Sequence, residues 1–175
     1  YGSFNAHSSG GKIIEFDEHN ILLSTGEFLF RDHAQNEKNV FGKILIINKS
    51  TKDYKIVSMG HRNIQGLYYD KKNDELFSTE HGPQGGDEIN INNNILDKIN
   101  NYGWPISSYG EHYNFKERDD NHELYIKAPL HNSHSKYGFI EPLKDFTPSI
   151  GCSEIVKIGK NKYVLAALGR STPGE

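Results

Sequence analysis

The hydrophobic and polar positions of this chain alternate with a period of two residues over many short runs. Runs of this kind, rich in β-branched and aromatic residues and bounded by Gly, Asn or Asp, predict β-hairpins. No stretch keeps helical spacing for three turns. The pattern therefore predicts an all-β fold, with strands at 11–17, 21–27, 42–48, 54–59, 66–70 and 75–79.

The unit of strand, turn and strand also repeats along the chain. A glycine, an apolar strand, an Asp/Asn turn and a strand ending in Thr-Gly-Glu or Thr-Glu-His-Gly occur at 11–27 and 66–82, and a weaker copy follows at 154–168. Copies about 50 residues or more apart are typical of propeller blades. A β-sandwich has similar strands but no reason to repeat the strand-end chemistry. Three blades cannot close a propeller, so we expect a larger protein or edges covered by partners.

The segment 107–150 is poor in alternation and rich in Tyr, His, Asn and Pro. We expect long loops there, with one short strand near 123–126. Long loops on a β scaffold often carry binding residues. We interpret His131 and His134 as solvated loop residues, because their spacing would share a metal-binding face only on a helix.

Composition excludes several classes of protein. The 175 residues carry a formal net charge of −3, which argues against a nucleic-acid binder or a polybasic membrane-surface protein. The longest apolar runs, such as 44–47, are too short to span a bilayer. Cys152 is the single cysteine, so an intrachain disulfide and an all-Cys zinc site are excluded. No signal-peptide pattern follows Tyr1, so we expect any targeting segment to be absent from this sequence.

Two polar segments are candidates for chemistry. Arg62 and Asn63 precede a strand and could donate to a carboxylate or carbonyl ligand, or Arg62 could clamp a neighbouring loop. The loop at 79–90 contains three glycines and a proline, exposes backbone carbonyls, and ends in Asp87 and Glu88. Adjacent strand residues point to opposite faces, so these two acids should serve different sites. Such oxygen ligands suit Ca²⁺ rather than zinc; a solvated turn is the alternative.

The stretch 101–113 is dense in aromatic residues and contains the only tryptophan of the sequence, Trp104. Aromatic residues beside Gly and Pro form either a packed loop core or a stacking wall for a flat ligand.

Three motifs in order resemble the soluble PQQ-dependent aldose sugar dehydrogenases of the glucose/sorbosone dehydrogenase family. They are Gly-His-Arg-Asn-x-Gln-Gly, Glu-His-Gly-Pro-x-Gly-Gly-Asp-Glu-x-Asn and Asn-Tyr-Gly-Trp-Pro. The resemblance is strong over 60–113 and weaker but collinear over 7–47 and 146–170. It implies a six-bladed β-propeller, of which residues 1–175 form roughly three blades from the middle half, with a long loop insertion at about 107–150.

The resemblance also implies a set of site residues. Arg62 and Asn63 match the pair that contacts PQQ, with Arg62 polarising the reactive carbonyl. Tyr113 matches an aromatic cofactor contact, and Ser149 lies in the segment that supplies a hydroxyl to the cofactor. His7 resembles the catalytic base.

Two Ca²⁺ ions are implied as well. The backbone carbonyls of Gly82 and Pro83 match the ligands of the ion that sits on PQQ. Glu88 and Tyr102 match ligands of a second, structural Ca²⁺.

This sequence departs from the family pattern at two places. His7 stands one residue further from the Gly-Gly pair than expected, and Lys12 replaces an Arg. Gly169 lies near where relatives often carry a cofactor-binding Lys.

The activity implied by the resemblance is Ca²⁺-assisted oxidation of an aldose at its anomeric hydroxyl, with hydride transfer to PQQ. The electron acceptor is unspecified, and a periplasmic or secreted location is inherited from the family. One alternative is a non-catalytic propeller binding module of the same family. Another is a Ca²⁺-dependent sugar lactonase, which needs an axial metal held by carboxylates, for which only Asp87 and Glu88 are at hand.

Overall fold

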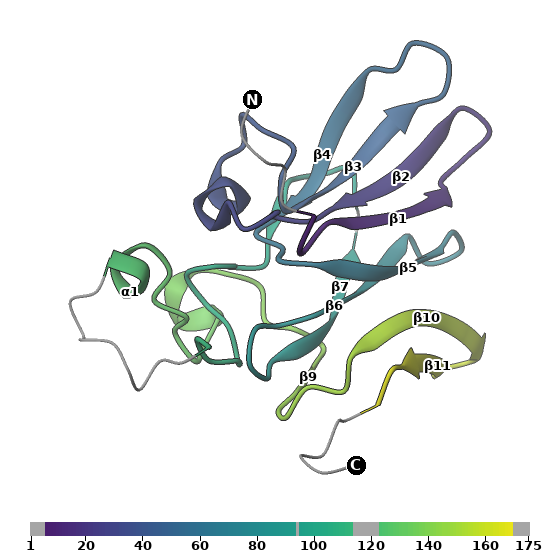
Figure 1. Ribbon diagram of the computed structural model, residues 1–175. Coiled ribbons are helices and arrows are strands. Elements are labelled where there is room, and N and C mark those ends of the chain that lie inside the picture. The colour runs from purple at the N-terminus through teal and green to yellow at the C-terminus, as the bar shows by residue number, and fades with distance from the viewer. Residues whose placement is uncertain (1–5, 94, 114–122, 170–175) are drawn as a thin grey trace.

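The computed structural model describes residues 6–93, 95–113 and 123–169 (Figure 1), and its described strands form three sheets. The first sheet runs in chain order and ends on a short parallel strand, as β1 (Gly10–Glu15), β2 (Asn20–Thr25), β3 (Lys43–Asn48), β4 (Tyr54–Met59) and β8 (Asn100–Asn101). The second contains β5 (Ile64–Asp70), β6 (Glu75–Glu80), β7 (Asp87–Asn93) and β9 (Lys144–Phe146). The third is the hairpin of β10 (Cys152–Gly159) and β11 (Lys162–Ala167).

The sheets are arranged side by side like blades, each with its first strand innermost. Strand β5 packs against β1 on one side and against β10 on the other, and the remaining strands of each sheet fan outward (Figure 1). Consecutive antiparallel strands joined by short turns, repeated around a common centre, are the architecture of a β-propeller. The predicted all-β fold and partial propeller are confirmed.

The three innermost strands share an irregularity at their beginnings. The pairing register shifts between Gly10 and Ile13 in β1, between Ile64 and Gly66 in β5, and between Cys152 and Ile155 in β10. Such bulges are common beside active sites, where they redirect side chains or end the pairing.

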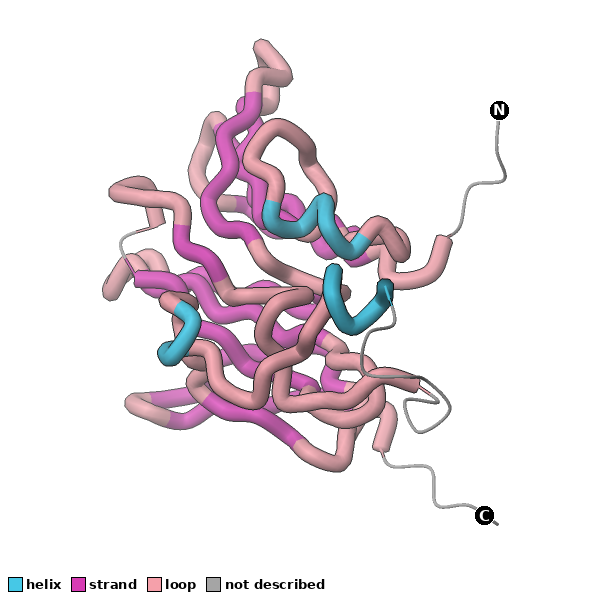
Figure 2. The backbone as a smooth tube through the Cα atoms, turned by 90° about the vertical axis from the view of Figure 1, so that its left-hand side faces the viewer, coloured by secondary structure: helices cyan, strands magenta, loops and turns pink. Residues whose placement is uncertain are grey.

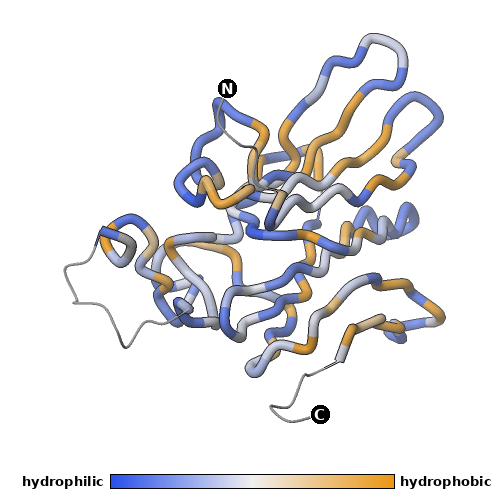
Figure 3. The backbone as a smooth tube through the Cα atoms, viewed as in Figure 1, coloured by the Kyte–Doolittle hydropathy of each residue, from blue (hydrophilic) through white to orange (hydrophobic). Residues whose placement is uncertain are grey.

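The hydrophobic core lies between the first and second sheets, where Figure 3 shows the central strands as strongly hydrophobic segments. Alternate residues of these strands turn inward, as the period of two predicts. The buried members are Leu22, Ile44, Ile46, Val57, Ile64, Leu67, Leu76 and Ile95. This core fixes β5 against the first sheet, and therefore fixes the segment that enters β5.

Helical structure in the described residues is confined to short turns within loops (Figure 2): η1 (Arg31–Gln35), α1 (Glu123–Lys127) and η3 (Ser135–Tyr137). The short strand expected near 123–126 is wrong, because that segment forms α1. Glu123 and Lys127 are four residues apart and form an ion pair, which stabilises a helical turn. No helix in the described part of the chain is long and apolar enough to cross a bilayer.

Candidate functional site

A cavity of about 440 Å³, here called the main cavity, opens where the innermost strands begin. Segments preceding β1, β5 and β10 and segments following β2 and β6 contribute to it. Its lining comprises His7, Ser8, Leu29, Arg62, Asn63, His81, Gly82, Pro83, Asp87, Tyr113, Ser149 and Gly151. The predicted cofactor and catalytic residues, and both residues of the predicted carbonyl pair, therefore share one cavity. Their chemical roles remain predictions.

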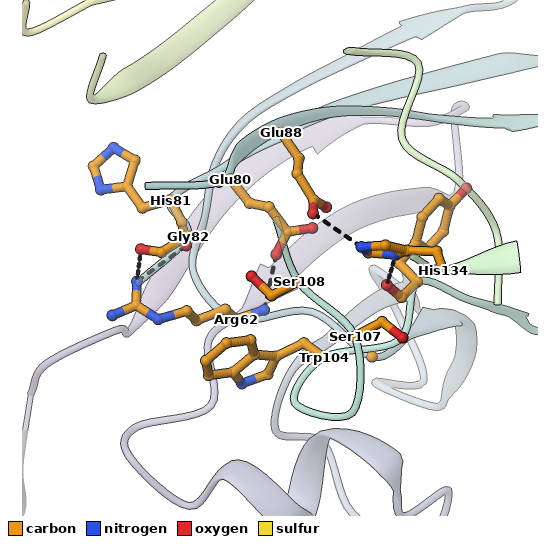
Figure 4. A pocket seen from close by; sticks show the side chains of 12 residues that line it. Arg62, Glu80, His81, Gly82, Glu88, Trp104, Ser107, Ser108 and His134 are labelled. Carbon is orange, nitrogen blue, oxygen red and sulfur yellow. Dashed lines mark hydrogen bonds and ion pairs between the residues drawn. The ribbon is translucent and has the colours of Figure 1, made fainter. Parts of the chain in front are cut away.

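Arg62 is fixed in place by the loop that follows β6. Its backbone N–H donates to Glu80 Oε2 over 2.8 Å, and its Nη1 donates to the carbonyls of His81 (3.0 Å) and Gly82 (2.6 Å) (Figure 4). The structure is therefore compatible with both predicted roles of Arg62, as a clamp on a neighbouring loop and as a donor to a ligand. It clamps the neighbouring loop, and it also lines the main cavity.

Trp104 lies beneath the Arg62 side chain (Figure 4), with the Arg62 Cζ atom 5.5 Å from its ring centroid. The Arg31 Cζ atom is 5.6 Å from the same ring. Trp104 and Tyr102 are both buried, so these aromatics form a packed loop core. Tyr113, by contrast, is 52% exposed and lines the main cavity. Cation–π attraction on a buried ring restricts both guanidinium groups.

A carboxylate near these arginines was not among the predicted site residues. Glu27 is fully buried, and burial raises the pKa of its carboxyl, although the charges of Arg62 and Arg31 act in the opposite direction. Its backbone N–H donates to the carbonyl of Arg62 over 3.0 Å. A signal for Glu27 does exist in the sequence, because it ends the Thr-Gly-Glu copy of the repeated strand-end motif.

The loop 81–86 has a shape that requires glycine. A Cβ atom on Gly82 would lie 2.3 Å from the carbonyl oxygens of both Gly85 and Gly86. Backbone hydrogen bonds of 3.1 and 2.9 Å between Gln84 and Glu111 hold the far end of the loop. The tight course of the backbone brings Gly82 and Pro83 to the lining of the main cavity.

Asp87 connects this loop to the entrance of β10. Its Oδ1 accepts the N–H of Gly82 over 3.1 Å, and its Oδ2 accepts the N–H groups of Ile150 (3.1 Å), Gly151 (2.7 Å) and Cys152 (3.3 Å). Asp87 lines the main cavity, whereas Glu88 lines a second, smaller one. The two neighbours therefore line different cavities, as expected for adjacent residues on a strand; the sites they serve remain predictions.

Asn63 and Ser149, which also line the main cavity, differ in their hydrogen bonds to the rest of the protein. The Asn63 Oδ1 accepts the backbone N–H of Gly10 over 3.1 Å and the Nε2 of Gln65 over 2.9 Å. The Ser149 hydroxyl is buried, and no group within the described residues hydrogen-bonds to it. A buried hydroxyl without a partner is unfavourable unless a ligand supplies one.

The smaller cavity, here called the inner cavity, lies behind Arg62 (Figure 4). Its lining comprises Gly60, Arg62, Glu80, His81, Gly82, Gly86, Glu88, Tyr102, Trp104, Ser107, Ser108 and His134. The predicted metal ligands Glu88 and Tyr102 meet here. The two cavities share Arg62, His81 and Gly82, so one loop forms the wall between them.

Two buried glutamates lie side by side at the inner cavity. Asn90 Nδ2 donates to Glu80 Oε1 (2.8 Å) and to Glu88 Oε2 (3.2 Å). Burial and the negative charge of Glu80 raise the pKa of Glu88 well above its usual value. For Glu80, burial is outweighed by the charge and hydrogen bond of His61, whose Nδ1 donates to Oε1 over 2.9 Å, so its pKa is lowered.

His134 also lines the inner cavity, so the expectation of a solvated loop residue is wrong for it. It is 1% exposed because its loop folds back onto Tyr102 and Tyr109. Its Nδ1 donates to the Tyr102 carbonyl over 2.9 Å, and its Nε2 lies 3.4 Å from Glu88 Oε1. Burial lowers its pKa. His131 is partly buried and stacks on Tyr137 with ring centroids 3.9 Å apart.

The oxygen-rich lining fits a hard cation better than a zinc ion. Among the described residues, no three His, Cys, Asp or Glu side chains gather as a metal-binding group, so a metal would depend on backbone carbonyls. At the inner cavity, a cation would offset the unfavourable charge of the buried Glu88. At the main cavity, the Gly82 carbonyl accepts from Arg62, and a carbonyl oxygen has a second lone pair that could bind a cation.

Comparison with known proteins decides the family. The chain matches the model of the Glucose / Sorbosone dehydrogenase family over residues 3–166. The chain belongs to this family. The resemblance found in the three sequence motifs is therefore confirmed.

Relatives of known sequence agree with this assignment. An uncharacterized protein of Synechocystis sp., slr1608, is 35% identical over 141 residues, covering 73% of this chain and 30% of that protein. Aldose sugar dehydrogenase YliI of Escherichia coli is 32% identical over 117 residues, covering 59% of this chain and 30% of that protein. This glucose/sorbosone dehydrogenase family chain thus matches about a third of the length of each relative.

Solved structures share its fold. The apo-form of the soluble aldose sugar dehydrogenase of Escherichia coli superposes with a TM-score of 0.71 at 25% identity, over 91% of this chain and 48% of that one. The PQQ-bound aldose sugar dehydrogenase of Streptomyces coelicolor gives 0.58 at 24% identity, over 91% of this chain and 42% of that one. The second likeness concerns the fold alone.

Proposed function

We propose that the full-length protein oxidises an aldose at its anomeric hydroxyl, with hydride transfer to PQQ and assistance from Ca²⁺. One observation carries the proposal: Arg62, Asn63, Tyr113 and Ser149 line a single cavity together with His7. Family membership and the name of one relative, an aldose sugar dehydrogenase, support the same reaction class.

The lining offers suitable contacts for an anionic, flat cofactor. PQQ would supply a quinone that accepts electrons, and Ca²⁺ a Lewis acid beside it. Arg62, held by two carbonyls and by Trp104, presents a fixed positive charge that would polarise a carbonyl oxygen. The buried Ser149 hydroxyl would donate to a second oxygen.

Each of the two cavities would hold one Ca²⁺ ion. The carbonyls of Gly82 and Pro83 would hold the ion in the main cavity. Glu88 and Tyr102 would hold a structural ion in the inner cavity.

His7 is the proposed base. An imidazole accepts a proton near neutral pH, and His7 lines the main cavity. Among the described residues that line this cavity, Asp87 is the one carboxylate that could compete with His7 as the base. The His7 imidazole would take the proton of the anomeric hydroxyl. Asp87 is committed to backbone N–H groups through both oxygens, so it does not serve as this base.

The experiment measures aldose-dependent reduction of an artificial electron-accepting dye by full-length protein supplied with PQQ and Ca²⁺. We expect turnover to fall about 10²- to 10³-fold in Arg62→Ala, since one fixed donor to developing charge is lost. Arg62→Lys should retain more activity because it keeps the charge. A chelator should abolish turnover, and added Ca²⁺ should restore it. Equal turnover in wild type and Arg62→Ala would contradict the proposal.

The second candidate is a family member that binds a ligand without oxidising it. Gly169 lies near where relatives often carry a cofactor-binding Lys, and His7 is shifted by one residue; the missing Lys and the shifted His7 favour this reading. Failure of the full-length protein to bind PQQ would select it. The lactonase alternative has less support, since the Asp87 carboxylate is engaged by backbone N–H groups and is not free to hold an axial metal.

The proposed substrate is an aldose, the electron acceptor is unidentified, and the proposed location, periplasmic or secreted, rests on family resemblance.

A further inference from the structure

The turn after β2 has an unusual backbone. Phe28 and Leu29 have φ angles of 50° and 67°, and the N–H of Phe30 donates to the carbonyl of Glu27 over 2.7 Å. A bond from residue i+3 to residue i, with positive φ at both central positions, is the geometry of a type I′ turn. Asn and Gly dominate these positions, because other side chains are strained at positive φ.

The surroundings hold this strained turn in place. The N–H of Phe28 donates to the carbonyl of Ser8 over 3.2 Å, and the N–H of Glu27 donates to the carbonyl of Arg62 over 3.0 Å. The Phe28 ring packs on Phe41 with centroids 5.3 Å apart. Strain of this kind persists only where neighbouring structure imposes it, and it concentrates at functional sites.

The side chain at the second strained position faces the main cavity. Leu29 is 46% exposed, so it contributes little to the core, and it lines the cavity with His7 and Arg62. A large apolar residue in a strained, half-exposed position gives the fold little stability. A ligand in the cavity would gain an apolar contact from it.

We propose that Leu29 is a specificity-determining residue whose side chain packs against the carbon face of a neutral aldose bound beside His7. This inference rests on the proposed function for the identity of the ligand. Pyranose rings present C–H groups on their faces, and an apolar wall complements them. A charged sugar acid would lose hydration where it meets Leu29, and this side chain offers it no polar partner, so contact with Leu29 favours neutral sugars.

The test compares wild type with Leu29→Asn in the full-length protein supplied with PQQ and Ca²⁺. Asn tolerates positive φ but provides no apolar contact. We expect the KM for D-glucose to rise about five- to tenfold, and the melting temperature to stay the same or rise. Leu29→Gly, which removes the side chain without adding a polar group, should raise the KM in the same way.

The matched control is Lys52→Asn. Lys52 also has a φ of 67° and is exposed in the turn after β3, outside the main cavity lining. It should show the same relief of backbone strain with no change in KM.

Two results would overturn the inference: an unchanged KM in Leu29→Asn, or a melting temperature lower by several degrees in Leu29→Asn but not in Lys52→Asn. The second would mean that Leu29 serves the fold. If the wild-type protein reduced the dye with none of the aldoses tested, the proposed function itself would be refuted. The two failures are therefore distinguishable.

Discussion

Asp87 and Glu88 are sequence neighbours with the same functional group in opposite environments. The Asp87 carboxylate accepts backbone N–H groups from Gly82 and from residues 150–152, two segments that are far from each other in the sequence. Glu88 is held beside another carboxylate, and its pKa is raised well above its usual value by burial and by Glu80. One residue therefore requires its negative charge to join two segments, and the other retains its charge only with difficulty.

Replacing Asp87 by Asn tests the first of these roles. The amide would place an NH₂ group against backbone donors, so we expect a loss of about 2–3 kcal/mol in the free energy of unfolding. Urea denaturation of the full-length protein measures it, with the exposed Asp53→Asn as a matched control. Equal midpoints for the two variants would contradict this role for Asp87.

Several site residues that the sequence predicted flank strands. Arg62 precedes β5 and Gly82 follows β6; these two strands are antiparallel neighbours in one sheet, so the beginning of β5 lies beside the end of β6 and the motifs could locate both residues. His134 could not be found in this way. Its burial depends on the course of a loop that packs on Tyr102 and Tyr109, and no periodicity encodes that course.

At the scale of elements, Lys43 joins the start of β3 to η1. The side chain is fully buried, and its Nζ donates to the carbonyls of His33 (2.9 Å), Ala34 (2.9 Å) and Phe41 (2.6 Å). It thereby gives a second donor to the η1 carbonyls of His33 and Ala34, which also accept the backbone N–H groups of Asn36 and Gly60. Burial lowers the pKa of Lys43 to about 8.

This depressed pKa predicts how stability depends on pH. An unfolded lysine titrates near 10.5, so between about pH 8 and 10.5 the unfolded state holds a proton that the folded state has released. Stability should therefore rise with pH across this window. Lys43→Met should abolish that rise, whereas the exposed Lys52→Met should keep it. Urea midpoints at pH 8, 9 and 10 measure the slopes, and identical slopes for wild type and Lys43→Met would contradict the assignment.

The strands predicted from alternation agree with the structure to within about two residues, whereas β7, whose first residues were placed in the loop at 79–90, and the shorter elements were not predicted. Runs such as 43–48 and 54–59 carry their own hydrophobic pattern. Strand β9 has three residues and exists because Lys144 pairs with Ile89 of β7. Its formation depends on that partner strand, which a local pattern cannot reveal.

At the scale of the whole molecule, the inner cavity joins the second sheet to two long loops. Glu88 comes from β7, Tyr102 follows β8, and His134 precedes η3. A cation bound among them would tie these three parts together, and its binding energy would add to the stability of the folded state.

Calcium should therefore raise the melting temperature of the full-length protein. Binding at a hundred times the dissociation constant adds about 2.7 kcal/mol. Glu88→Gln should lose the part of this shift that comes from the inner cavity, and without Ca²⁺ it should match or exceed wild-type stability, since burial already favours an uncharged group there. The exposed Glu111→Gln is the matched control. A calcium-induced shift that is as large in Glu88→Gln as in wild type would exclude this residue as a ligand. Thermal melts with Ca²⁺ or chelator give the answer.

The opposite orientations of Asp87 and Glu88 also limit how the chain can vary in length. Ordinary surface loops accept insertions and deletions. A one-residue insertion in 81–86 that moved β7 by one position would exchange the faces of the two carboxylates, because side chains alternate along a strand. The clamp on Ile150 and Gly151 would be lost, and the inner cavity would receive the wrong acid. The number of residues between Glu80 and Asp87 is thus set by the pleat of β7.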